Sequence, residues 1–221
     1  MRFEMELGPY KAQVFTSPDD GVHPLIWIHS FPGEAEKIWK TCNKNFSLAA
    51  ITGIHWNRDL SPWPAQRAFA QGEDFDGGAQ RYLEVFTKEI VPAVEEKLPF
   101  IVSDRGIAGY SMAGLFAIYA MYHSPLFQRF GSMSGSLWFD GWVDYALKHT
   151  PAVGELAIYV SLGSREHKVR ESRMAKAREA LDTLVNHWQK DCRVCYEINP
   201  GGHFTDVPGR MARGLDRLAL M

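Results

Sequence analysis

Short runs of apolar residues alternate along this chain with longer segments in which apolar residues recur every three or four positions. The runs have the length and continuity of β-strands buried on both faces, whereas the recurring positions mark one face of an amphipathic helix. Expected strands lie at residues 25–29, 49–56, 105–110, 130–134, 156–162 and 194–198, and expected helices at 79–98, 113–122, 138–149, 171–190 and 211–220. This alternation predicts an α/β fold, a mainly parallel central sheet with helices on both faces.

Three further features complete the expected architecture. Residues 2–7 and 10–16 have the pattern of two short strands around Gly8-Pro9, which predicts a hairpin. Residues 57–78 contain two prolines and three glycines and predict a long irregular loop, a length that is usually functional or disordered. Pro92 predicts a kink in the helix at 79–98.

A serine stands at the junction between one expected strand and the helix that follows it. Ser111 lies in Gly109-Tyr110-Ser111-Met112-Ala113, with small residues two positions before and two positions after it. Strand, sharp turn and helix around an exposed serine form the nucleophile elbow, in which strand and helix pass so closely that only small residues fit there. The alternative is a tight turn that carries a solvated serine.

Polar residues also follow other expected strands, at the sheet edge where ligands bind in parallel α/β sheets. Glu166 follows the strand at 156–162 and His203 follows the strand at 194–198. Serine, acid and histidine occur in the chain order of an α/β-hydrolase triad. The imidazole would deprotonate the serine, and the carboxylate would hold the imidazole in the required tautomer. Backbone N–H groups of Met112 and Phe31 are the candidates for the oxyanion hole.

Other residues of the same types remain as alternatives. His55 and His167 are rival bases, and His29, which ends a strand, is expected to be packed or to support the site. Asp140 and Asp144 are rivals to Glu166 as the acid. Asp206 lies so close to His203 in sequence that a local helix cap is the expected role.

Composition narrows the class of protein. The chain has 221 residues, 46% of them hydrophobic and 23% charged, with a net charge of −2. These values predict one globular domain, residues 1–221, with no room for a large cap domain. No basic stripe indicates nucleic-acid binding, no apolar run is long enough for a membrane span, and the acidic N-terminus does not resemble a signal peptide, so we expect a cytoplasmic protein. The sequence gives no indication of the oligomeric state.

The cysteines do not change this interpretation. An odd count of three argues against a disulfide framework. Cys192 and Cys195 have C-x-x-C spacing, but in a strand residues three apart point to opposite faces, and no second pair is present. We therefore expect ordinary strand cysteines, no metal site and no cofactor.

Several of these segments resemble a known family. They are GYSMAGLFA (109–117), SGSLW (134–138), LGSRE (162–166), GGHF (201–204) and NRDLSPW (57–63). They are similar to the "Putative esterase" family of α/β-hydrolases, which includes esterase D-type, enterochelin and feruloyl esterases and mycobacterial mycolyltransferases. The resemblance implies the α/β-hydrolase fold, a triad of Ser111, Glu166 and His203, and an oxyanion hole from the amides of Phe31 and Met112. Siderophore esterases that use a Ser–His dyad leave a dyad as the alternative.

The expected function is hydrolysis of a small-molecule carboxylic ester through an acyl-enzyme. Asp59, Trp63 and Trp138 flank loops at the strand ends, so we expect them to border the substrate pocket. Aromatic walls would suit an aryl, sugar or siderophore acyl group. Two alternatives remain: an acyltransferase of the same fold, in which an alcohol replaces water, and a hydrolase-fold protein that only binds ligands or partners.

Overall fold

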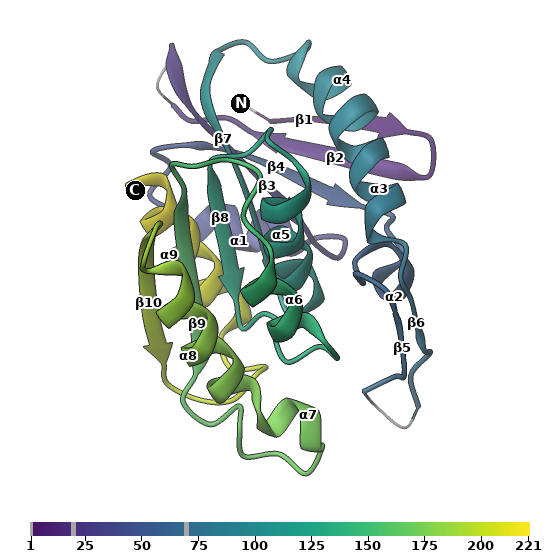
Figure 1. Cartoon of the computed structure of the whole chain (residues 1–221). Helices are drawn as coiled ribbons and strands as arrows, with labels where there is room; N and C mark the ends of the chain where they lie inside the picture. Colours follow the sequence, from purple (N-terminus) through teal and green to yellow (C-terminus); the bar gives the residue numbers. More distant parts are fainter. Residues whose placement is uncertain (1, 19–20, 69–70) are drawn as a thin grey trace.

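The computed structural model describes residues 2–18, 21–68 and 71–221, and an eight-stranded sheet forms the centre of this described part (Figure 1). Its strands are β1 (Arg2–Leu7), β2 (Tyr10–Phe15), β3 (Val22–His29), β4 (Ser47–Thr52), β7 (Ile101–Tyr110), β8 (Arg129–Met133), β9 (Ala157–Gly163) and β10 (Arg193–Asn199). Their order is β1-β2-β4-β3-β7-β8-β9-β10. The pairs β1–β2 and β2–β4 are antiparallel and all others are parallel. The predicted α/β-hydrolase fold is therefore confirmed.

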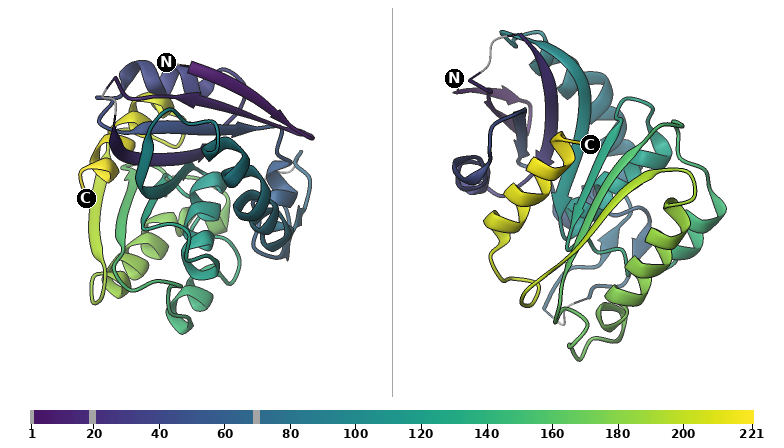
Figure 2. Two further views of the ribbon diagram at one scale, coloured as in Figure 1. Left: turned by 90° about the horizontal axis from the view of Figure 1, so that it is seen from above. Right: turned by 90° about the vertical axis from the view of Figure 1, so that its left-hand side faces the viewer.

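Helices cover both faces of the sheet (Figure 2). On one face, α1 (Glu34–Thr41) packs beside α9 (Val207–Ala219). The other face carries α3 (Ala79–Val85), η1 (Phe86–Ile90), α4 (Val91–Glu95), α5 (Met112–His123), α6 (Trp142–Lys148) and α8 (Ala177–Trp188). The short elements α2 (Trp56–Asp59), β5 (Pro64–Ala65), β6 (Phe75–Asp76) and α7 (Ser172–Ala175) lie at the end of the molecule toward which β8 and β10 point (Figure 1).

Helix α5 is the most deeply buried helix, which explains its sequence. Every residue from Met112 to Tyr122 is buried, because the helix packs on β7 and β8 and is covered by other helices. A helix that is apolar all round belongs in the interior of a domain rather than on its surface. The nucleophile elbow is therefore anchored between a buried strand and a buried helix.

The sequence pattern located most elements, but several differ from the prediction. The helix expected at 79–98 contains a π-helical turn, in which the N–H of Val91 bonds to the carbonyl of Phe86. Pro92 follows directly and has no N–H for the carbonyl four residues earlier, so a wider turn at this point fits its neighbour. The expected helix at 171–190 is divided at Lys176, the helix expected at 138–149 begins only at Trp142, and α1 corresponds to no prediction.

The carboxyl ends of four neighbouring strands lie level with one another. Tyr110 of β7 pairs with Met133 of β8, Met133 pairs with Ser161 of β9, and Gly163 at the end of β9 pairs with Asn199 at the end of β10. Residues that follow these strands therefore emerge at one edge of the sheet. This register brings together side chains that are far apart in the sequence.

Candidate active site

Ser111 occupies the sharp turn between β7 and α5. Its backbone has φ 54° and ψ −120°, a region that non-glycine residues seldom adopt and that costs about 1–3 kcal/mol. The turn leaves no space at Gly109, where a Cβ atom would overlap the backbone and side chain of Ala113. A hydrogen bond of 3.2 Å from the Ser111 N–H to the carbonyl of Met133 fixes the turn against β8. The structure has the geometry of a nucleophile elbow.

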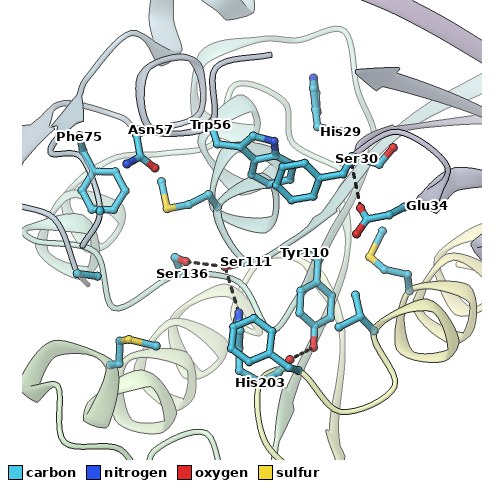
Figure 3. A pocket seen from close by; sticks show the side chains of 18 of the residues that line it. His29, Ser30, Glu34, Trp56, Asn57, Phe75, Tyr110, Ser111, Ser136 and His203 are labelled. Atoms are coloured by element: carbon cyan, nitrogen blue, oxygen red, sulfur yellow. Dashed lines mark hydrogen bonds between the residues drawn. The ribbon is translucent and has the colours of Figure 1, made fainter. Parts of the chain in front are cut away.

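The hydroxyl of Ser111 lies between the side chains of Ser136 and His203 (Figure 3). Its Oγ is 3.2 Å from Nε2 of His203, and Nδ1 of the same ring is 2.9 Å from Oε2 of Glu166. An ionised carboxylate only accepts hydrogen bonds, so Nδ1 carries the ring proton and Nε2 is left to accept the proton of Ser111. The sequence-predicted serine, histidine and acid thus meet in one contiguous array.

Glu166 is 6% exposed, and its carboxylate accepts hydrogen bonds from three further donors besides His203. Oε1 accepts hydrogen bonds from Ser134 Oγ and from the N–H of Gly163, each 2.6 Å long, and it also contacts the guanidinium of Arg210 at 3.1 Å. Burial alone would raise the pKa of this carboxyl, but hydrogen bonds from His203 and Ser134 outweigh burial and hold the pKa below its ordinary value. Glu166 is therefore ionised at neutral pH.

The loop that carries His203 is fixed on both sides of the ring. Gly201 has φ 99°, and a Cβ atom there would overlap Thr205, so this position requires glycine. The hydroxyl of Tyr110, the residue before Ser111, donates a hydrogen bond of 2.6 Å to the carbonyl of His203. Tyr110 therefore ties the histidine loop directly to the strand that leads into the elbow.

Two backbone N–H groups, from residues that line the same cavity as Ser111, are candidates to bind a developing negative charge. Met112 is the first residue of α5, so its N–H has no partner within the helix. Phe31 follows β3, and its N–H donates a hydrogen bond of 2.9 Å to Oε2 of Glu34. Both residues line the cavity above Ser111, and the second amide is occupied by a side chain of the protein itself.

A cavity of about 370 Å³ opens above Ser111 and His203. Its wall is largely aromatic and aliphatic, and the rings of Phe31 and Trp56 stack there with centroids 4.4 Å apart. The apolar lining also includes Ile38, Phe75, Met112, Trp138, Met174, Phe204, Val207 and Met211. Two acidic and two basic side chains also contribute to the lining: Glu34, Glu73, Lys37 and Arg67. The stretch expected as a long loop forms α2, β5 and β6 and supplies part of this wall.

Two of the three expected pocket residues do not line this cavity. Trp138 does, but Trp63 packs among aromatic side chains of the core and donates a hydrogen bond of 2.8 Å from Nε1 to the carbonyl of Asp140. Asp59 is buried on α2, where its carboxylate accepts the N–H of His55 at 2.8 Å and pairs with a neighbouring arginine. Neither side chain is part of the cavity lining, which differs from the prediction for Asp59 and Trp63.

The rival residues have other positions. His29 lines the inner wall but bonds through Nε2 to the hydroxyl of Tyr82 over 2.9 Å, and burial lowers the pKa of His29 to about 3. Asp140 pairs with Arg173 at 2.9 Å. The remaining rivals, His55, His167 and Asp144, are absent from the lining of the cavity described above. Asp206 accepts the N–H of Gly209 and caps α9, as predicted.

Three further observations concern alternative chemistry. Within the described ranges, no group of three His, Cys, Asp or Glu side chains is arranged to hold a metal ion. Cys42, Cys192 and Cys195 are all unpaired thiols. No helix in the part of the chain that the structure describes is both long and apolar enough to cross a bilayer.

Sequence reasoning missed several residues that contact the array. Ser136 Oγ lies 3.4 Å from Ser111 Oγ, and Ser134 and Arg210 hold Glu166. Ser134 and Ser136 lie in the SGSLW segment and could have been found from it. Arg210 could not, because a single arginine in an amphipathic helix is normally a solvent-exposed residue.

Comparisons with known proteins found similar sequences and similar structures. The family model described as "Putative esterase" matches residues 39–203. The uncharacterized protein YbbA of Bacillus subtilis is 26% identical over 200 residues, covering 84% of this chain and 80% of that protein. The iron(III) enterobactin esterase of Escherichia coli is 25% identical over 223 residues, but the match covers 85% of this chain and only 54% of that protein. The siderophore hydrolase EstB from Aspergillus nidulans has a similar structure, with a TM-score of 0.72 and 22% identity over 99% of this chain and 93% of EstB.

Proposed function

Because the chain belongs to the "Putative esterase" family and is a carboxylic ester hydrolase, we propose that it cleaves small-molecule esters through an acyl-enzyme on Ser111. His203 is the proposed general base and Glu166 the proposed acid of the triad. The observation that carries this proposal is the unbroken chain of contacts from Ser111 Oγ to His203, 3.2 Å, and from His203 to Glu166, 2.9 Å. A dyad is disfavoured because the carboxylate is ionised and bonded to the ring.

In the first half-reaction, Oγ of Ser111 attacks the ester carbonyl carbon while Nε2 of His203 takes the hydroxyl proton. A carbon–oxygen bond forms, and the carbonyl electron pair moves onto the oxygen. The resulting oxyanion would accept hydrogen bonds from the N–H groups of Met112 and Phe31. When the intermediate collapses, the bond to the alcohol breaks and the alcohol leaves with the proton from His203.

In the second half-reaction, a water molecule takes the place of the alcohol. His203 removes one proton from the water as its oxygen attacks the acyl carbon, and the proton then passes to Ser111 as the carboxylic acid departs. The same steps with a second alcohol in place of water would transfer the acyl group. The two outcomes differ only in the acceptor, so product analysis in the presence of alcohols separates them.

The oxyanion hole requires one local rearrangement. The N–H of Phe31 is bonded to Glu34, so the carboxylate must move aside before that amide can bind an oxyanion. Glu34 is only partly buried and begins α1, and its side chain can rotate toward solvent without a change in the backbone. The hydrogen bond from Phe31 is then free for the substrate.

The cavity lining favours esters with an aromatic or aliphatic group. Phe31, Trp56, Phe75 and Trp138 provide flat apolar surfaces, which suit an aryl acyl group. The Escherichia coli relative is named an iron(III) enterobactin esterase, so we propose siderophore-type aryl esters as the first substrates to examine. This chain spans about half of that protein, so the choice of substrate is a separate proposal from ester hydrolysis itself.

Labelling with a fluorophosphonate tests the function directly. The reagent phosphonylates an activated serine, so the folded wild-type protein should be labelled and the Ser111→Ala variant should not. Ser136→Ala is the matched control, because its hydroxyl is nearby but has no bond to His203, and it should still be labelled. A folded wild-type protein that resists labelling would favour a protein that only binds ligands. A p-nitrophenyl ester series of increasing acyl length then defines the substrate class.

A further inference from the structure

We propose that Arg210 is a positioning residue of this site, whose buried guanidinium fixes the carboxylate of Glu166 and the loop of His203 relative to Ser111. The inference rests on the proposed serine-esterase function. Arg210 lies near the start of α9, beyond the family match at residues 39–203, and is 1% exposed. A buried cation is costly unless it is paired and fully hydrogen-bonded, so its contacts indicate why it is there.

Those contacts connect the loops that carry the reactive residues. Nη1 donates to Glu166 Oε1 over 3.1 Å and to Ser134 Oγ over 3.0 Å. The same nitrogen lies 2.9 Å from the hydroxyl of Tyr110, so its two protons are shared among three acceptors, and Nη2 donates to the carbonyl of Pro200 over 3.0 Å. These four partners lie at or just beyond the ends of β7, β8, β9 and β10. One rigid, planar group therefore joins the ends of four adjacent strands.

The contacts of Arg210 also position His203, the proposed base, as well as Glu166, the proposed acid. Tyr110, held by Arg210, donates its own hydroxyl proton to the carbonyl of His203 over 2.6 Å. Pro200 precedes the Gly201-Gly202 pair that leads to His203. Both anchors restrict a loop that its glycines would otherwise leave mobile. The ring of His203 is thereby held in register with Ser111 through backbone contacts and not only through Glu166.

The surroundings are shaped to admit the guanidinium. A Cβ atom at Gly163 would lie 2.6 Å from Nη2 of Arg210 and 2.7 Å from Oε1 of Glu166, so any side chain at this position would separate the pair. Ser134 adopts φ 49°, an uncommon conformation for serine, and directs its hydroxyl to Glu166. Two positions thus accept steric or conformational constraints that the Arg210–Glu166 pair explains.

The charge of Arg210 also acts on the base. The charged or titratable groups in contact with the Glu166 carboxylate are His203 and Arg210, and Tyr110 contacts Arg210 in turn. While His203 is neutral, Arg210 and Glu166 cancel in charge. Removing the cation from this buried cluster raises the proton affinity of the cluster, whichever member binds the proton. The cation therefore affects the reactive residues through its charge as well as through its hydrogen bonds.

Two substitutions of Arg210 separate the effect of its charge from the effect of its hydrogen-bonding geometry. Arg210→Met removes both, so the acid limb of the kcat/KM profile for a p-nitrophenyl ester should move about one unit to higher pH, with kcat at the plateau reduced about tenfold or more. Arg210→Lys keeps the charge but loses the planar set of donors, so the acid limb should stay in place while kcat falls. KM should change little in either variant, because the guanidinium does not line the cavity.

Arg129→Met is the matched structural control. Nη1 of Arg129 also holds α9, through the carbonyls of Leu218 at 2.9 Å and Ala219 at 3.0 Å, but its acidic partner is Asp104 and not Glu166. This variant should lower Tm and leave the acid limb unchanged. The inference is overturned if Arg210→Met keeps the wild-type acid limb, or if Arg129→Met moves the limb equally. Should Arg210→Met not fold, wild-type kcat in a folded Arg210→Lys variant overturns it.

One readout is independent of turnover. A proton NMR titration of the His203 ring, compared between wild type and Arg210→Met, should give a higher midpoint in the variant. An unchanged midpoint overturns the inference about Arg210. Absence of fluorophosphonate labelling in the wild type would instead refute the proposed function, and the NMR comparison would still decide the role of Arg210.

Discussion

The backbone N–H of Phe31 donates a hydrogen bond of 2.9 Å to the carboxylate of Glu34, and the N–H of Glu34 returns one of 3.2 Å to the carbonyl of Phe31. The two bonds close a tight turn between β3 and α1, at the edge of the cavity. If the Phe31 amide binds the oxyanion, as we propose, the Glu34 carboxylate competes with the substrate for the same donor. Glu34 then lowers the rate of turnover.

Glu34→Ala should therefore increase kcat/KM for a neutral p-nitrophenyl ester. A hydrogen bond to a partly exposed carboxylate contributes about 1 kcal/mol, which corresponds to about a fivefold increase. Glu36→Ala is the matched control, since Glu36 lies on the same helix and pairs with Lys40 instead. Unchanged kcat/KM in Glu34→Ala would mean that Phe31 is not an oxyanion donor.

Glu166→Gln distinguishes a triad from a dyad. The amide keeps the size of the side chain but loses the charge that orients and stabilises the imidazole, so kcat should fall by about 10²–10⁴-fold. KM should remain near the wild-type value, because Glu166 lies behind the ring and outside the cavity lining. Steady-state kinetics on a p-nitrophenyl ester measures both. A decrease of less than about threefold would support the Ser111–His203 dyad.

The two tryptophans first assigned to the pocket make a matched pair. Trp138 lines the cavity and Trp63 does not, so Trp138→Ala should raise KM for a bulky aryl ester more than for an acetate. We expect a difference of about tenfold, since removing an aromatic contact costs about 1–2 kcal/mol. Trp63→Ala should lower Tm through lost core packing and leave the ratio of the two KM values unchanged. The reverse pattern would restore Trp63 to the pocket.

His29 predicts a loss of stability at mildly acidic pH. Burial lowers the pKa of His29 to about 3, so below about pH 6.5 the unfolded chain binds a proton that the folded protein does not. The free energy of unfolding should therefore decrease as pH falls from about 6.5 toward 3. The contribution of this one group is about 2 kcal/mol between pH 7 and pH 5.

Urea unfolding at pH 7 and pH 5 measures this effect. His29→Gln can still bond to Tyr82 but does not titrate, so its stability should change less with pH than that of the wild type. His55→Gln, which removes an exposed histidine by the same substitution, is the matched control. An identical pH dependence in His29→Gln and the wild type would contradict the prediction.

The residues that the sequence located best are those that directly follow apolar strands. In a parallel sheet the strand ends share an edge, so Ser111, Glu166 and His203 could be placed together before any contact was known. Strand ends do not indicate where a side chain points once a short helix intervenes. Asp59 lies on α2 and Trp63 follows it, and their side chains bond to other partners instead of lining the cavity.

Other features depend on packing that leaves no local pattern. The π-helical turn before Pro92 follows from a missing N–H donor and could be anticipated only as a kink. Helix α1 is short, with two acids in its first turn, and its apolar positions did not stand out from a loop. Arg210 is a polar residue on an amphipathic helix, and only the folded structure shows that its guanidinium points inward.

The position of Arg210 on α9 affects how the pH dependence of activity can differ among related proteins. All three proposed catalytic side chains come from the segment that the family model matches, whereas the cation behind them comes from α9. Relatives that keep the same serine, acid and histidine but place an uncharged residue at the equivalent of Arg210 would catalyse the same reaction. As the pH falls, they would lose activity at a higher pH than this protein does. Replacement of one residue outside the shared motifs would thus adapt an enzyme of this kind to acidic or neutral surroundings.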